Sequence, residues 1–211
     1  MMIEKIKLIG FRLLVVLTLF VLCVNIGYAE EEEEDVGPYF YDLDKDLQDI
    51  ADHLAETAGQ TNIEFAEMGV PYINAFAMHP NRIAITTGYI KYSMKYTGDY
   101  RFTIGTLSHE IGHLVLGHVG GHGKLNYTED GVANRNQERA ADYFGIELMW
   151  KAGYDCAYDA QDWSVQISRN PERAQVQGNT HPAMQERLDS SRKLCESLKA
   201  GNGVPTDMYF E

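Results

Sequence analysis

The sequence predicts an α+β fold that is mainly helical and contains a small β-sheet. Three observations support this prediction. The 211 residues suffice for one ordinary domain, apolar side chains recur at helical spacing in several long segments, and one region is rich in short β-prone runs. With 45% hydrophobic and 11% aromatic residues, the chain can build a globular core. A formal charge of −13 argues against nucleic acid as a partner and disfavours docking on anionic lipid.

Residues 1–29 have the features of a signal peptide. Lys5, Lys7 and Arg12 give a positive start, an apolar run follows over residues 13–24, and small residues precede a cleavage point after Ala29. The apolar run is shorter than the roughly 20 residues that span a bilayer. We therefore expect export to the periplasm, and an uncleaved segment that tethers the chain to the inner membrane is the alternative.

The remaining chain divides into three parts. Residues 30–41 form an acidic leader, residues 42–200 form the folded domain, and residues 201–211 form a polar C-terminal tail. No repeat or second domain boundary is visible. The mature chain is expected to have no stable membrane insertion after signal cleavage.

The domain opens with an amphipathic helix over residues 42–58, where Leu43, Leu47, Ile50 and Leu54 share one face. Two β-prone runs follow, separated by a turn signal at His79-Pro80-Asn81, and they predict a hairpin or a pair of sheet strands. The runs cover residues 72–77 and 82–87, and further helices are expected over residues 101–118, 133–151 and 182–200.

The sequence His109-Glu110-Ile111-Gly112-His113 predicts a metal centre. Histidines four residues apart project from one face of a helix, so both rings can reach one zinc ion, and the glutamate beside them can act as a general base. Apolar residues on the other side of the same helix form a core stripe: Ile104, Leu107, Ile111, Leu114 and Val115.

A catalytic zinc needs a third protein ligand and one open position. The metzincin pattern would place a histidine where Val119 stands. His118, one residue earlier, turns into the apolar stripe if the helix continues, which favours a role as a core or helix-end histidine. His122 lies in a glycine-rich stretch and is a weak candidate.

The next helix offers a better third ligand. Glu138 and Asp142 are also four residues apart, with the small residues Ala141 and Gly145 beside them, so this helix can approach the first one closely. Glu138 would complete the zinc ligands. Asp142 would accept a hydrogen bond from the far ring nitrogen of a ligand histidine and orient that ring.

Two cysteines lie outside the signal segment, Cys156 and Cys195. In an oxidising compartment such a pair favours a disulfide, and neither residue has the closely spaced partners of a metal site. Two buried thiols are the alternative.

Four stretches together resemble the gluzincin zinc metallopeptidases, the family of the CAAX prenyl protease, HtpX and BepA. They are Asn74-Ala75-Phe76-Ala77, the H-E-x-x-H block with His118 five residues beyond it, residues 138–142, and Thr180-His181-Pro182 followed by Arg187. The resemblance covers roughly residues 43–198. It implies a zincin-like helical domain with a small sheet whose edge strand borders the zinc cleft.

The resemblance further implies that the Asn74–Ala77 strand binds substrate backbone and that His181 and Arg187 reach the active site. His181 would stabilise an oxyanion or occupy the open position of zinc in a resting state, and a role in capping the helix after it is the alternative. The membrane spans of the CAAX protease and HtpX, and the tetratricopeptide array of BepA, are not seen in this sequence.

These observations predict a zinc-dependent endopeptidase with Zn²⁺ as cofactor. Its expected partners are polypeptides, in particular misfolded exported proteins in cell-envelope quality control. The alternatives are a zinc-bound, holdase-like binding protein and a latent protease that needs an activating partner.

Overall fold

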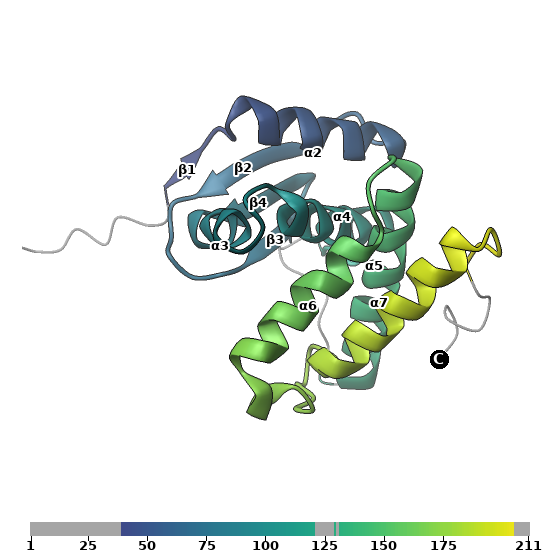
Figure 1. Cartoon of the computed structure of the whole chain (residues 1–211). Helices are drawn as coiled ribbons and strands as arrows, with labels where there is room; N and C mark the ends of the chain where they lie inside the picture. Colours follow the sequence, from purple (N-terminus) through teal and green to yellow (C-terminus); the bar gives the residue numbers. More distant parts are fainter. Residues whose placement is uncertain (1–38, 121–128, 130, 205–211) are drawn as a thin grey trace, which may run out of the picture. The chain divides into compact units, whose positions relative to one another are not determined.

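A computed structural model describes residues 39–120, 129 and 131–204 (Figure 1). The predicted signal peptide, most of the predicted leader and tail, and His122 lie outside these residues. The described part is mainly helical and contains a mixed four-stranded sheet, which confirms the α+β prediction. Within these residues, no helix combines the length and the apolar character needed to cross a membrane.

The strands are β1 (Phe40–Tyr41), β2 (Glu64–Met68), β3 (Ala75–Met78) and β4 (Arg82–Thr86), and their order in the sheet is β1-β2-β4-β3. The two predicted β-prone runs become β4 and the antiparallel edge strand β3, with Ala77 opposite Ile83. β2 pairs with β4 in parallel and was not predicted. β1 occupies the last two residues of the segment predicted as a leader, so these two residues belong to the sheet.

The α-helices of the described chain are α2 (Lys45–Thr57), α3 (Thr87–Thr97), α4 (Arg101–Val115), α5 (Gly131–Lys151), α6 (Ala157–Arg169) and α7 (Met184–Lys199), with a short 3-10 helix η1 (Pro171–Arg173). The four predicted helices correspond to α2, α4, α5 and α7. Helices α3 and α6 were not predicted. Helix α4 ends three residues earlier than expected, which changes the position of His118.

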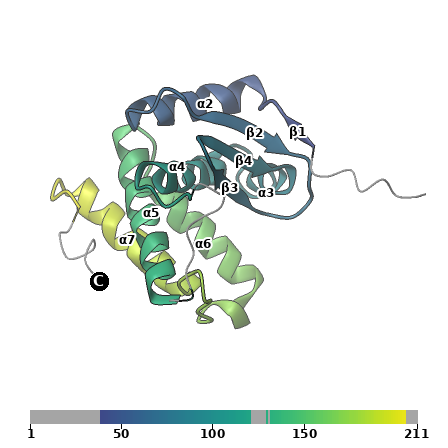
Figure 2. The same ribbon diagram turned by 180° about the vertical axis from the view of Figure 1, so that it is seen from behind.

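Helix α4 lies at the centre of the fold. It packs against β3 and β4 of the sheet on one side and along α5 on another, and both views show α5 beside α4 (Figures 1 and 2). Its predicted stripe supplies core residues, since Ile104, Leu107 and Ile111 are buried. Val115 was expected in this stripe but is 36% exposed, because the helix ends at this residue.

Helices α6 and α7 pack against each other, and α7 also packs on α5. A disulfide joins Cys156, just before α6, to Cys195 on α7, with their Cα atoms 5.4 Å apart. Both cysteines are buried in the core. The disulfide thus ties α7 to the segment that leads into α6.

Candidate metal centre

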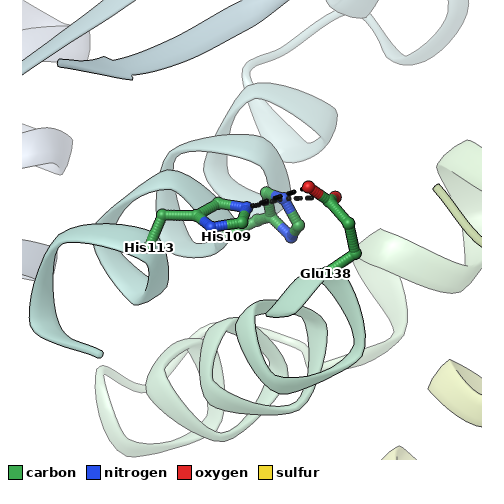
Figure 3. A group of neighbouring side chains, drawn as sticks. All are labelled: His109, His113 and Glu138. Atoms are coloured by element: carbon green, nitrogen blue, oxygen red, sulfur yellow. Dashed lines mark hydrogen bonds and ion pairs between the residues drawn. The ribbon is translucent and has the colours of Figure 1, made fainter. Parts of the chain in front are cut away.

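His109, His113 and Glu138 converge on one point between α4 and α5 (Figure 3). The Nε2 atoms of the two histidines are 3.0 Å apart. Each lies 3.4 Å from a different carboxylate oxygen of Glu138. His113 and Glu138 are each only 1% exposed, so the centre is well shielded from solvent.

These three groups fit a zinc ion. Ligand atoms about 2.1 Å from zinc in tetrahedral geometry lie about 3.4 Å from one another, and the observed separations are 3.0 to 3.4 Å. Two imidazoles and a carboxylate also form a donor set of the kind that catalytic zinc sites use. The residues present could therefore hold the metal and leave a position for water.

Asp142 holds His109 from the side opposite the centre. Its Oδ1 lies 2.8 Å from His109 Nδ1, so this ring presents Nε2 to the metal position. Burial opposes a charge on His109, but hydrogen bonds to Asp142 and Glu138 outweigh burial and raise its pKa to about 10. The metal-free centre therefore retains a proton on His109 that a metal ion must displace.

Arg187 completes this arrangement from α7. Its Nε donates to Asp142 Oδ2 at 2.8 Å, and a second guanidinium nitrogen donates to Oδ1. The guanidinium also lies over the Trp163 ring, 4.1 Å from its centroid. Burial raises the pKa of Asp142, but the charges and hydrogen bonds of Arg187 and His109 together outweigh burial, and the pKa is lowered. Asp142 is therefore an ionised acceptor for His109.

His113 has a different outer partner. Its Nδ1 lies 3.0 Å from Nδ1 of His118, and the two rings meet edge to face. Burial lowers the pKa of His118 to about 4, with the neighbouring His113 adding to the effect. His118 is thus neutral and lies at the end of α4, one of the two expected positions; it does not turn into the apolar stripe, because the helix ends at Val115.

Two glycines allow α4 and α5 to approach closely enough to form the centre. A Cβ atom on Gly112 would lie 3.1 Å from the backbone oxygen of Ala141, and one on Gly145 would lie 2.8 Å from the backbone nitrogen of His109. Only backbone atoms without a side chain fit at these positions. The small residues that the sequence places on this face therefore set the distance between His109 and Glu138.

Glu110 links the metal centre to the sheet. Its Oε2 accepts a hydrogen bond of 2.8 Å from the backbone N–H of Ala77, in the edge strand β3. Thr86 N–H donates to Asn74 O, so Asn74 faces β4 and the alternate residues Ala75 and Ala77 face the free edge. The predicted base and the predicted substrate strand are thus in direct contact.

His181 reaches the same centre from the segment before α7. Its Nε2 lies 3.6 Å from Glu138 Oε2, and its Nδ1 lies 2.7 Å from Thr180 Oγ1. The N-cap of α7 is Ala183, so His181 does not take the capping position that was the alternative. Burial lowers the pKa of His181.

A cleft of about 490 Å³ extends from the centre between β3, α4, α6 and the segment before α7. Asn74, Glu110, His181 and Arg187 line it together with residues of α6 that the sequence did not single out: Asp159, Asp162, Trp163 and Gln166. Burial and the nearby Asp142 raise the pKa of Asp159 to about 6. The hydroxyl of Tyr92 donates to Asp162 at 2.7 Å, which fixes the wall of the cleft.

Two protein-family models match the chain. Peptidase family M48 matches residues 42–122, which hold the edge strand and the H-E-x-x-H helix. Peptidase U49 matches residues 105–202, which hold Glu138, Asp142, His181 and Arg187 as well as the same helix. Among curated proteins, none matches this sequence. Both matches are to peptidases, and they overlap over the H-E-x-x-H motif of the two-histidine, one-glutamate centre, which supports a zinc metallopeptidase family for this chain.

Proposed function

We propose that the protein is a zinc-dependent endopeptidase with Glu110 as its general base. The observation that carries this proposal is the hydrogen bond from Ala77 N–H to Glu110 Oε2, beside the histidines of the same helix. It places a carboxylate between the metal centre and a free strand edge. A base in this position has both the attacking water and a peptide on the strand within reach.

His109, His113 and Glu138 would hold the zinc ion. When bound, zinc supplies Lewis acidity, which makes water more acidic and polarises the scissile carbonyl. Glu110 then takes a proton from the attacking water and delivers it to the leaving amine. Because Glu110 is buried to 8% exposure, its carboxylate is shielded from bulk water and acts on the nearest proton donor.

Substrate backbone would pair with β3. Ala75 and Ala77 face the free edge, and Asn74 and Ala75 line the cleft. An extended peptide can therefore add to the sheet as a further strand, which recognises backbone and suits cleavage within a chain. The Ala77 N–H that now binds Glu110 would release the carboxylate to water when the peptide arrives.

His181 would stabilise the oxyanion. Thr180 Oγ1 lies 2.7 Å from Nδ1 of His181. With the Thr180 hydroxyl as donor, the neutral ring would carry its proton on Nε2, the atom that lies near Glu138. A hydrogen bond to the developing oxyanion is commonly worth about 3 kcal/mol in the transition state. Arg187 supports the site indirectly, because it holds Asp142.

The cell envelope is the setting that we propose, with misfolded exported polypeptides as substrates. Support comes from the signal-like composition of residues 1–29 and from the family resemblance. A free strand edge binds a peptide mainly through backbone hydrogen bonds and contacts few side chains. Such an edge suits unfolded polypeptides as substrates.

Metal analysis and a casein cleavage assay on the same preparation test the function. We expect about one zinc ion per chain, cleavage that a chelator abolishes, and recovery when zinc is restored. Cleavage that persists without metal would contradict the proposal, and so would zinc-loaded protein that cleaves neither casein nor unfolded polypeptides.

A further inference from the structure

The two ligand histidines have outer partners of different chemistry. His109 Nδ1 meets the Asp142 carboxylate at 2.8 Å, whereas His113 Nδ1 meets another imidazole, that of His118, at 3.0 Å. A ligand histidine that binds metal through Nε2 carries its proton on Nδ1 and donates it to an acceptor. His118 Nδ1 is the atom in position to accept this proton.

The end of α4 explains how His118 comes to lie there. Gly117 has φ +70°, a left-handed conformation that glycine adopts without strain, and its N–H donates to Leu114 O at 3.2 Å. The N–H of His118 donates to His113 O at 2.9 Å. These two bonds form a Schellman motif. In this motif the second residue after the C-cap, here His118, bonds to the residue three positions before the C-cap, here His113.

In α4 the position three residues before the C-cap is His113, a proposed metal ligand. A Schellman motif commonly brings an apolar contact between the same two positions, but here the contact joins two ring nitrogens. The cap therefore does more than satisfy the last carbonyl groups of α4. It fixes the ring of His118 against Nδ1 of His113.

We propose that His118 is a positioning residue for the metal centre: the Gly117 turn places its Nδ1 as the acceptor that fixes the tautomer and orientation of the ligand His113. This inference rests on the proposed zinc centre, and it assigns the α4 cap a part in metal affinity. His118 does not touch the metal position itself, because its contact is with the far side of the His113 ring.

Substitutions at His118 can distinguish the effect of its hydrogen-bond acceptor from the effect of the size of its ring. The Oδ1 of asparagine is attached to Cγ, as Nδ1 is in histidine, so His118→Asn retains an acceptor at the same place. His118→Leu keeps the branching at Cγ but puts a methyl group there. His118→Asp supplies a carboxylate, as Asp142 does for His109.

The measurement is the zinc dissociation constant, determined by chelator competition on chains whose metal-free thermal midpoints agree. We expect His118→Leu to weaken zinc binding about 10- to 100-fold, and His118→Asn and His118→Asp to stay within a few-fold of wild type. His53→Leu is the control, because His53 lies on α2 and bonds to Ala152 O. It should leave zinc affinity unchanged.

Nitrogen-15 NMR of the zinc-loaded wild type gives a second reading that needs no variant. We expect His113 to carry its proton on Nδ1 and His118 to carry its proton on Nε2. The inference is overturned if His118→Leu binds zinc as wild type does, if His118→Asn is as weak as His118→Leu, or if His118 holds its proton on Nδ1. Wild-type protein that binds no zinc would instead overturn the proposed function.

Discussion

A single carboxylate, that of Asp142, links His109 of the metal centre to Arg187. It accepts from Arg187 on α7 and contacts His109 on α4, and it lies one helical turn from the proposed ligand Glu138 on its own helix. Because Arg187 keeps this carboxylate ionised, His109 retains a proton until a metal ion displaces it. Metal affinity at the proposed centre should therefore depend on residues that do not touch the metal.

Replacing Glu138 by Gln should weaken zinc binding by more than about a hundredfold, since loss of a ligand exceeds the usual effect of losing an outer partner. The amide is close to the carboxylate in size but is a poorer ligand. Glu147→Gln is the matched control on the same helix, where Glu147 pairs with Lys151 at the surface. Equal zinc affinity in Glu138→Gln and wild type would show that the third ligand is misassigned.

Asp159 should make stability depend on pH. Burial raises its pKa from 3.8 to about 6, so the folded state binds a proton more tightly than the unfolded state. The free energy of unfolding therefore falls as pH rises from about 4 to 6 and stays lower above this window. Asp159→Asn removes the ionisation, so its stability relative to wild type should increase by about 1 to 3 kcal/mol between pH 4 and pH 7.

Denaturant unfolding of both chains in chelator, at several pH values, measures this difference. Asp155→Asn is the control of opposite sign, because a hydrogen bond from Lys199 lowers the pKa of Asp155. Its carboxylate favours folding above the unfolded pKa, and this contribution is lost as pH falls. A difference between Asp159→Asn and wild type that does not change with pH would contradict the account.

The convergence of the proposed ligands was predictable, and the positions of several of their neighbours were not. His109, His113, Glu138 and Asp142 follow from a spacing of four residues, which a helix turns into a shared face. His118 was expected as a core or helix-end histidine, and its contact with His113 was not foreseen because it depends on where α4 ends. The signal for that end is Gly117, a residue type that commonly terminates helices in a left-handed conformation.

At the scale of elements, the spacing of α4 and α5 decides the geometry of the centre. Gly145→Ala should lower stability by about 1 to 3 kcal/mol and weaken zinc binding, because its Cβ would lie 2.8 Å from His109 N and 3.1 Å from His109 Cα. Backbone atoms cannot yield as a side chain does. The two helices must therefore separate, which moves His109 from Glu138.

Gly105→Ala on α4 is the matched control for this substitution. Its Cβ would lie 3.6 Å from the backbone of Asp159, an ordinary contact, so the alanine should fit and raise helix stability by about 0.5 to 1 kcal/mol. Thermal unfolding and zinc titration of the two variants make the comparison. If Gly145→Ala behaves like Gly105→Ala, close helix approach does not set the metal geometry.

The disulfide between the start of α6 and α7 should stabilise the domain. It closes a sequence separation of 39 residues, and loops of this length correspond to about 2 to 4 kcal/mol. The double variant Cys156→Ala and Cys195→Ala should lose this amount, as should reduced wild type. Alkylation without reductant, followed by peptide mass analysis, checks the bond in protein from an oxidising compartment. Full labelling of both cysteines would contradict it.

Elements with strong periodicity were predictable, and elements that depend on distant pairing were not. Leu47 and Leu54 mark α2, whereas β2 has the sequence Glu64–Met68, whose glutamates, alanine and methionine favour a helix. It becomes a strand because parallel pairing with β4 buries Phe65 and Met68. Helix α3 begins directly after β4. Its N-cap, Thr86, lies within the run that the sequence predicts as a strand, so the start of the helix was not recognised.

At the scale of the whole domain, α4 connects the sheet to the C-terminal helices. On one side of α4, Glu110 accepts a hydrogen bond from β3. On another side, His109 and His113 lie close to Glu138 of α5. Helices α6 and α7 then add the cleft wall, Arg187 and the segment with His181. The overall class was predictable from helix content, but the walls of the cleft were not, because α6 contributes side chains without a spacing motif.

The most direct test of the central claim is peptide hydrolysis by wild type and Glu110→Gln at equal zinc occupancy. Glu110 is assigned as a proton carrier and not as a ligand, so the variant should keep its zinc and its fold. Its rate should fall by at least about a hundredfold to ten-thousandfold, the usual contribution of a general base. Glu110→Gln activity within a few-fold of an active wild type would contradict the assignment. A zinc-loaded wild type that cleaves no peptide would instead favour a binding protein or a latent enzyme.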